Sequence, residues 1–206
     1  VFSYYKGIVG HCGYNRTPGC TLVDGELLVQ YREDDSLLTS TRGAVWNFPA
    51  YRKGAFTTSI RFNDSRSNGK LVLNDRWFNP TDTTAPYFAP FVIPLDPKRL
   101  KISDGNAHIL RVEWDIDSKN PRAEVYVDNR KRMSIPLTNA SLHGLSYAHF
   151  LSDDRPGDQG YTIQWVKAEK KHPTKVACVG NSVTFGAGIE NPEEKYPAQL
   201  QEMLGD

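Results

Sequence analysis

Between residues 20 and 170 the chain alternates short runs of strand-forming residues with turn signals, and no convincing helical period intervenes. In the run "HILRVEWDI" the apolar residues Leu110, Val112 and Trp114 alternate with charged residues. A period of two places one strand face on a core and the other in water. The turns between the runs, such as "SDGNA" and "SRSNGK", contain the Gly, Asn and Asp residues that hairpins need. The pattern therefore predicts a mainly β protein built as an antiparallel β-sandwich.

The tryptophans are assigned to two different environments. Trp114 and Trp165 lie in strand-like runs and are flanked by alternating polar residues, so we expect both in the core. Trp77 lies in the long polar stretch "LNDRWFNPTDTTAPYF", where an exposed ring could stack on a sugar. Asp75 and Arg76 precede it, and they either contact the same ligand or form an ion pair within the loop. Trp77, Arg76 and Asp75 are therefore the candidate carbohydrate-binding residues of the sandwich.

Three carboxylates in "VEWDID" follow one another at a spacing of two residues: Glu113, Asp115 and Asp117. On a strand this spacing separates neighbouring carboxylates by roughly 7 Å, which is close to the separation that glycoside hydrolases use. Arg111 would share the same strand face. We therefore interpret these residues as a solvated charged face and not as a catalytic pair.

The overall charge and hydropathy argue against two classes of partner. The net charge is +1 and no basic block is longer than "NRKRM", so we expect no nucleic-acid partner. No apolar run approaches the roughly 20 residues that a membrane-spanning helix needs. The opening residues "VFSYYKGIVG" lack the features of a signal peptide, and the chain begins with Val1, so we expect a processed chain or a fragment.

The cysteines are Cys12, Cys20 and Cys178, and none has the C-x-x-C spacing of a metal site. We therefore expect neither a bound metal nor a cofactor. Cys12 and Cys20 flank "GYNRTPG", a turn-rich loop that a disulfide could close. A disulfide of this kind would suit a secreted or periplasmic protein, and this is the localisation that we expect.

One hairpin carries a resemblance to a known fold family. The segment "DGNAHILRVEWD…AEVYVDN" resembles concanavalin-like and laminin-G-like jelly rolls, in which a His-x-Leu-x-Val-x-Trp strand precedes a Val-Tyr-Val-Asp-Gly hairpin. Asn129 stands where the family has the hairpin glycine, and Asn also accepts a positive φ. The resemblance implies a two-sheet jelly roll whose concave face often holds carbohydrate.

The sequence pattern changes near residue 172. The stretch "AEKKHPTK" is a short charged connector, and after it the pattern becomes strand, glycine-rich turn and helix, as in an α/β unit. We therefore expect a sandwich domain over residues 1–170, a linker over 171–175 and a second domain over 176–206.

The second domain resembles the first conserved block of SGNH (GDSL-type) hydrolases. The residues that carry the resemblance are "VACVGNSVTFGAGI…YPAQLQEMLGD", which match a "GDSITxG" turn and the helix that follows it in the family. The resemblance implies that Ser182 is the nucleophile and that its backbone N–H is an oxyanion donor. Asn181 stands where the family has Asp, and we expect it to support the turn. Many members of the family are carbohydrate esterases that remove acetyl groups from glycans.

The family's Asp-x-x-His catalytic pair follows the serine, but all five histidines of this chain precede Ser182 and none stands in an Asp-x-x-His. We therefore expect residues 176–206 to be the first strand, turn and helix of a truncated SGNH domain, inactive alone. The predicted parent is a modular serine esterase acting on an acetylated carbohydrate. The alternatives are a non-catalytic module that binds a glycan, or an accessory domain of a sialidase-type glycosidase.

Overall fold

The computed structural model divides the chain into two compact units, Val1–Glu169 and Lys170–Asp206. Of the second unit it describes only four residues, so the strand, serine turn and helix predicted after residue 174 lie outside the described part. The described residues are 13–16, 20–30, 43–80, 82–102, 104–152, 159–171, 191 and 195.

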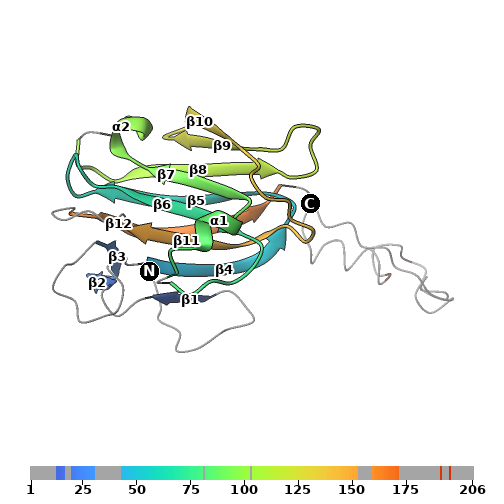
Figure 1. The fold of residues 1–206 in the computed structure, drawn as a ribbon, viewed down its shortest axis with the longest axis horizontal. Helices are drawn as coiled ribbons and strands as arrows, with labels where there is room; N and C mark the ends of the chain where they lie inside the picture. Colours follow the sequence, from blue (N-terminus) through green and yellow to red (C-terminus); the bar gives the residue numbers. More distant parts are fainter. Residues whose placement is uncertain are drawn as a thin grey trace. The chain divides into compact units, whose positions relative to one another are not determined.

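The first unit contains a five-stranded sheet in the order β1-β4-β11-β6-β7 (Figure 1). Every neighbouring pair in this sheet is antiparallel. Its strands are β1 (Gly13–Arg16), β4 (Gly43–Tyr51), β11 (Leu145–Ser152), β6 (Gly69–Asn74) and β7 (Phe91–Leu95).

A seven-stranded sheet in the order β10-β9-β8-β5-β12-β3-β2 forms the second layer (Figure 1). Two short helices, α1 and α2, flank β7 in the sequence. The strands are β10 (Arg130–Pro136), β9 (Arg122–Val127), β8 (His108–Asp115), β5 (Lys53–Phe62), β12 (Tyr161–Lys170), β3 (Glu26–Val29) and β2 (Thr21–Val23). The helices are α1 (Ala85–Phe88) and α2 (Pro97–Leu100).

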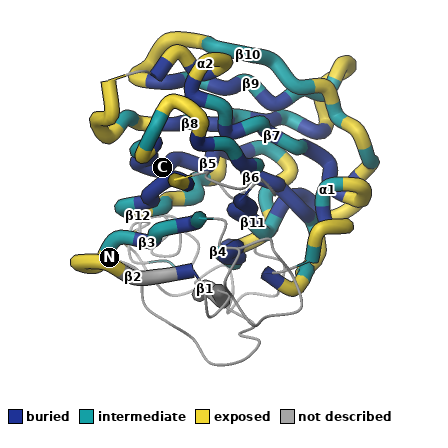
Figure 2. Tube along the Cα trace, turned by 60° about the vertical axis from the view of Figure 1, so that its left-hand side comes forward, coloured by how far each residue is buried: buried dark blue, intermediate teal, exposed yellow. Residues whose placement is uncertain are grey.

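Apolar side chains from both sheets form one core, which confirms the predicted antiparallel sandwich. The rings of Phe56 on β5 and Phe150 on β11 lie 6.0 Å apart across the two layers. The central strands are buried along most of their length, whereas β10 and the loops are half-buried or exposed (Figure 2). Burying these apolar faces against each other is the main stabilising term of such a sandwich.

Trp114 lies in the core, as its place in the sequence predicts. The alternation in β8 sends Leu110, Val112 and Trp114 inward, and the tryptophan is only 2% exposed. Its indole Nε1 donates a hydrogen bond to the carbonyl oxygen of Tyr51 at 2.9 Å. The buried polar atom is therefore satisfied, as a core tryptophan requires.

Trp165 is not a core residue, and the prediction for it is wrong. Tyr161 and Ile163 are buried in the core, and Val166 and Ala168 also pack against it. The inward positions of β12 therefore change from odd to even numbers within the strand. A shift of one residue in the alternation turns the side chains that follow it to the other face, and Trp165, which precedes the inward-facing Val166, is 37% exposed.

The β9–β10 hairpin turns on two residues with positive φ. Asp128 has a φ of 48° and Asn129 a φ of 64°. Two-residue hairpin turns of the type that matches strand twist need positive φ at both central positions. The expectation that Asn129 takes the place of the usual glycine is therefore confirmed.

Limited proteolysis is expected to release the sandwich as a stable piece. The first unit has its own core, and "KKHPTK" offers trypsin several lysines just after β12. Brief trypsin treatment should cut first between Lys170 and Lys175, as mass spectrometry of the fragments would show. A connector that resists trypsin while the sandwich is cut elsewhere would contradict the predicted domain boundary.

Candidate functional site

The segment of residues 75–88 joins β6 to β7 through α1 and carries several aromatic rings. Trp77 is 39% exposed, Tyr87 77% and Phe88 52%. The rings of Phe78 and Phe88 stack, with their centroids 6.1 Å apart and their planes 14° from parallel. This aromatic segment therefore exposes three large rings, and large apolar side chains gathered in one exposed segment are typical of a binding surface.

Two sets of hydrogen bonds hold the aromatic segment against the five-stranded sheet, and Figure 1 shows α1 in front of that sheet. The Asn139 side-chain amide donates to the carbonyl oxygens of Tyr87 at 3.0 Å and Ala89 at 2.9 Å. The His149 Nε2 lies 3.0 Å from the carbonyl oxygen of Pro80. The segment is therefore fixed to β11 and to the loop that precedes it.

The three predicted carbohydrate-binding residues stand together at the start of this segment. Arg76 Nε donates to Asp75 Oδ1 at 2.8 Å, and this hydrogen bond raises the pKa of the guanidinium. The Arg76 side chain remains largely exposed beside the exposed ring of Trp77. The loop ion pair is thus present, and the assignment of these residues to sugar binding stays a prediction.

Three polar residues lie in one row across the outer face of the five-stranded sheet. Tyr147 on β11 pairs with Asn47 on β4 and with Asn74 on β6. Their neighbours Ala148 and Leu73 are buried in the core, so the row faces away from it. Side chains directly opposite each other on neighbouring strands are in contact range. We call these residues the polar row; the sequence alone did not indicate it.

Asn74 ends the polar row and is almost fully buried, with 1% exposure. Within the described part of the chain, neither the nitrogen nor the oxygen of its side-chain amide has a hydrogen-bond partner. His149 is two residues from Tyr147 on the same face, and its Nδ1 is buried without a partner as well. Burial lowers the pKa of His149 to about 4, so its ring is neutral at pH 7.

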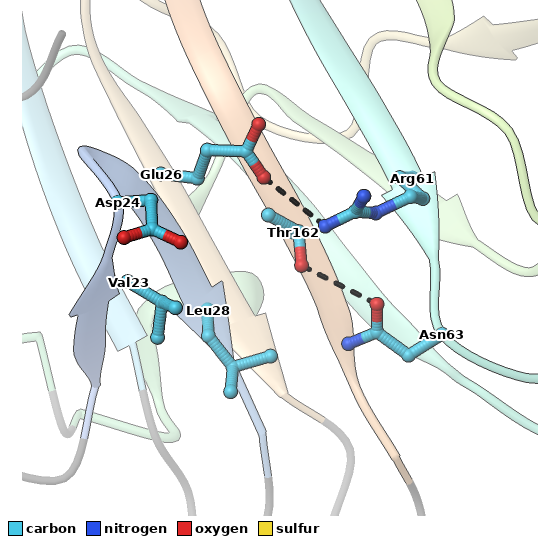
Figure 3. Close-up of a pocket in the computed structure, with 7 residues that line it drawn as sticks. All are labelled: Val23, Asp24, Glu26, Leu28, Arg61, Asn63 and Thr162. Atoms are coloured by element: carbon cyan, nitrogen blue, oxygen red, sulfur yellow. Dashed lines mark hydrogen bonds and ion pairs between the residues drawn. The ribbon is translucent and has the colours of Figure 1, made fainter.

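A separate pocket of about 430 Å³ lies beside the β2–β3 hairpin, and four of its polar side chains bond to one another in two pairs (Figure 3). Arg61 Nη2 lies 3.1 Å from Glu26 Oε2, and Thr162 Oγ1 donates to Asn63 Oδ1 at 3.3 Å. These groups are engaged with each other, so we do not assign a ligand to this pocket. Its lining residues are Val23, Asp24, Glu26, Leu28, Arg61, Asn63 and Thr162.

The carboxylates of "VEWDID" are all ion-paired. Arg111 Nε donates to Glu113 at 2.9 Å, Lys53 Nζ lies 2.8 Å from Asp115, and Arg52 Nε donates to Asp117 at 2.9 Å. The hydrogen bonds from Lys53 and Arg52 lower the pKa values of the two aspartates. A glycosidase acid needs the opposite shift. The interpretation as a charged face is supported, although Asp117 lies in the turn after β8.

His108 bridges two carboxylates at the start of β8. Its Nδ1 lies 2.6 Å from Asp128 and its Nε2 lies 2.8 Å from Asp104. Two hydrogen bonds raise the pKa of His108: the one with Asp128 has the larger effect and the one with Asp104 the smaller. The pKa of Asp104 falls to about 2, chiefly through its hydrogen bond with His108. The imidazolium therefore links the β9–β10 hairpin to the turn that precedes β8.

Replacing His108 with glutamine is expected to destabilise the sandwich in a pH-dependent way. Since the folded state raises the pKa of His108, folding favours its protonated form. Its contribution is fully present below the unfolded pKa of about 6.5 and is lost as the pH rises through the higher folded value. Urea denaturation at pH 5.5 should separate His108→Gln from the wild type, and the difference should shrink at pH 9. If the stability difference between His108→Gln and the wild type were equal at pH 5.5 and pH 9, the proposed ionic link from His108 to the two carboxylates would be contradicted.

Three predictions concern residues outside the described part. Ser182 and Asn181 lie there, and their roles as nucleophile and turn support stay predictions. Cys12 lies there as well, so the disulfide with Cys20 also stays a prediction. The Cys20 thiol is buried and donates to the carbonyl oxygen of Leu28 at 3.3 Å.

The described part of the chain contains neither a helix that could cross a membrane nor a candidate metal site. None of the described helices combines the length and the apolar character that crossing a bilayer requires. Nor does this part of the chain bring three or more His, Cys, Asp or Glu side chains into a group that could hold a metal ion.

No protein-family model matches the chain. An acetylxylan esterase from Xylanibacter ruminicola is 39% identical over 67 residues, which cover 31% of this chain and only 14% of that esterase.

The similar solved structures define the class of fold. A sialidase aligns with a TM-score of 0.57 at 13% identity, over 77% of this chain and 17% of that one. A legume lectin-like domain from Entamoeba histolytica has a TM-score of 0.50 at 8% identity, over 77% of this chain and 90% of that one. The metal-free carbohydrate recognition domain of Emp46p has a TM-score of 0.50 at 10% identity, over 76% of this chain and 87% of that one. The sandwich is therefore a lectin-like jelly roll, as the resemblance of its hairpin predicts.

Proposed function

We propose that the sandwich is a carbohydrate-binding module that uses the aromatic segment as its stacking surface. The observation that carries this proposal is the exposure of Trp77, Tyr87 and Phe88 on one segment of a lectin-like jelly roll. The names of the similar structures, a sialidase and two carbohydrate-recognising or lectin-like domains, support the same class of ligand.

The chemistry of a sugar suits this surface. A pyranose ring has apolar C–H faces and a rim of hydroxyl groups, so aromatic rings can cover a face while polar side chains bind the rim. The Asp75–Arg76 pair stands directly before Trp77 and supplies both an acceptor and charged donors. Asn74, which ends the polar row, lies one residue before Asp75 in the sequence. Stacking rings and hydrogen-bonding groups are therefore adjacent in the chain.

A panel of oligosaccharides tests this function. We expect the 206-residue chain to bind at least one of xylohexaose, acetylated xylo-oligosaccharides and sialyllactose in calorimetric titrations. The first two ligands follow from the acetylxylan esterase match and the third from the sialidase match. Removing the ring with Trp77→Ala should weaken binding at least about tenfold, since burying and stacking a large aromatic ring contributes roughly 1.5 kcal/mol or more and about 1.4 kcal/mol corresponds to tenfold. A chain that binds none of these sugars would contradict the proposal.

A second function, ester hydrolysis through Ser182, is favoured by the 39% identity to an acetylxylan esterase. In this mechanism the Ser182 hydroxyl attacks an acetyl carbonyl while its own backbone N–H holds the oxyanion. The ester C–O bond then breaks, the sugar leaves as an alcohol with the proton taken from the serine, and water hydrolyses the acyl-enzyme to release acetate. The serine needs a base to accept its proton. His149 is buried and bonded to Pro80, and His108 is held between two carboxylates, so neither suits that task. Together, the two proposed functions describe a protein in which a glycan-binding module is joined to a carbohydrate esterase.

Hydrolysis of an aryl acetate separates this second function from binding alone. We expect no turnover by the 206 residues. A longer chain, extended along its coding sequence, should be active and should lose activity on Ser182→Ala, because base-assisted attack contributes about 10²–10⁴-fold. Turnover by the 206-residue chain that Ser182→Ala abolishes would show that one of its own histidines is the base.

A further inference from the structure

Asn74 differs from the other described residues with an unpartnered buried side-chain atom, because both polar atoms of its amide lack a partner. Its amide has one acceptor oxygen and two N–H donors, and none of these finds a partner among the described residues although the side chain is buried. Asn139 offers a direct contrast, because its amide donates to two carbonyl oxygens. A buried amide without partners lowers the stability of the fold, so the position calls for a physical explanation.

His149 presents a second unpartnered atom on the same face of the sheet. Its Nε2 bonds to the carbonyl oxygen of Pro80, so the ring proton is assigned to Nε2 and Nδ1 is an acceptor. Tyr147 pairs with Asn74 and His149 pairs with Val72, which makes Asn74 and His149 diagonal neighbours on β6 and β11. The two residues together present buried donors and acceptors that the protein leaves unused.

We propose that Asn74 and His149 bind neighbouring hydroxyl groups of a neutral sugar, at the inner end of the polar row. This inference rests on the proposed carbohydrate-binding function. A hydroxyl oxygen accepts from the Asn74 N–H, and hydroxyl protons are donated to Asn74 Oδ1 or His149 Nδ1. A carboxylate suits the site less well than hydroxyl groups, because it has no proton to donate to Asn74 Oδ1 or His149 Nδ1 and only the Asn74 N–H could bond to it.

The polar row gives the sugar a path to Asn74. Asn47 and Tyr147 are half-buried and lie on the same face as Asn74, with Tyr147 between the other two. A sugar lying along the row reaches Asn74 when the Tyr147 side chain changes its rotamer, and such changes commonly accompany binding. The ring of Trp77, three residues after Asn74, is then available to stack on the same ligand.

The first test is thermal stability without ligand. Asn74→Leu removes the unbonded amide and keeps a side chain of similar size, so we expect the melting temperature to rise by about 2–4 °C. Asn139→Leu is the matched control and should lower it, because two hydrogen bonds are lost. A fall for Asn74→Leu comparable to that of Asn139→Leu would overturn the inference, because it would mean that ordered water already satisfies the amide.

The second test is calorimetric titration with xylohexaose and with sialyllactose. We expect Asn74→Leu and the smaller Asn74→Ala to bind xylohexaose at least about tenfold more weakly than the wild type, and we expect xylohexaose to be preferred to sialyllactose. If Trp77→Ala abolishes binding while both Asn74 variants retain it, the proposed function stands and this inference is wrong. If the wild type binds neither of these sugars nor acetylated xylo-oligosaccharides, both the proposed function and this inference fail.

Discussion

Replacing Trp114 with alanine is expected to lower the free energy of unfolding by about 3–5 kcal/mol, the range for removing a large aromatic side chain from a core. The indole is 2% exposed, lies 6.3 Å from the ring of Phe48 and bonds to the carbonyl oxygen of Tyr51. Its loss would leave a cavity between the sheets and remove the hydrogen bond from the indole to the Tyr51 carbonyl oxygen. Urea denaturation of the purified variant measures this change directly.

Trp77→Ala is the matched control for that measurement. Trp77 is 39% exposed and belongs to the aromatic segment, so its removal should cost far less stability. If Trp77→Ala proved more destabilising than Trp114→Ala, the assignment of the two rings to surface and core would be reversed.

Gly160→Ala is expected to cost roughly 2–5 kcal/mol, the sum of left-handed backbone strain of about 1–2 kcal/mol and overpacking of about 1–3 kcal/mol. Gly160 has a φ of +69°, and a Cβ atom there would lie 2.2 Å from the carbonyl oxygen of Val29. That oxygen belongs to the backbone at the end of β3, so it cannot move away without disturbing the ladder between β3 and β12. Thermal or urea denaturation of the variant measures the loss.

Gly105→Ala separates the two causes. Gly105 has the same φ of +69°, but a Cβ atom there meets nothing within 4 Å. Its replacement should cost only the strain, roughly 1–2 kcal/mol. Equal losses for the two variants would mean that the close approach of Gly160 to β3 does not limit stability.

Local pattern was sufficient to predict the parts of the fold that depend on one strand or one turn. The side chains of β8 that face the core follow from the alternation of apolar and polar residues along that strand. The turn at Asn129 follows from the tolerance of asparagine for positive φ. Trp165 was assigned wrongly for the opposite reason. The residues of β12 that face the core change from Tyr161 and Ile163 to Val166 and Ala168, and the sequence of the strand does not signal this shift.

The candidate site was only partly predictable for the same reason. Asp75, Arg76 and Trp77 are consecutive, so a polar stretch with an aromatic ring indicated them directly. The polar row combines residues from β4, β11 and β6, which are far apart in the sequence. Its members can be found only when strand order and register are known, because a shift of one residue would turn each side chain to the other face. The unpartnered atoms of Asn74 and His149 likewise emerge only from the packed structure.

The central claim is that the sandwich binds a sugar through the aromatic segment on its five-stranded sheet. The most direct test is a calorimetric titration of the 206-residue chain with xylohexaose, carried out on the wild type, Trp77→Ala and Trp165→Ala. The two tryptophans have nearly equal exposure, but Trp165 lies on β12 of the other sheet. We predict that Trp77→Ala weakens binding at least about tenfold while Trp165→Ala leaves it unchanged. Loss of binding in Trp165→Ala with full binding in Trp77→Ala would contradict the claim.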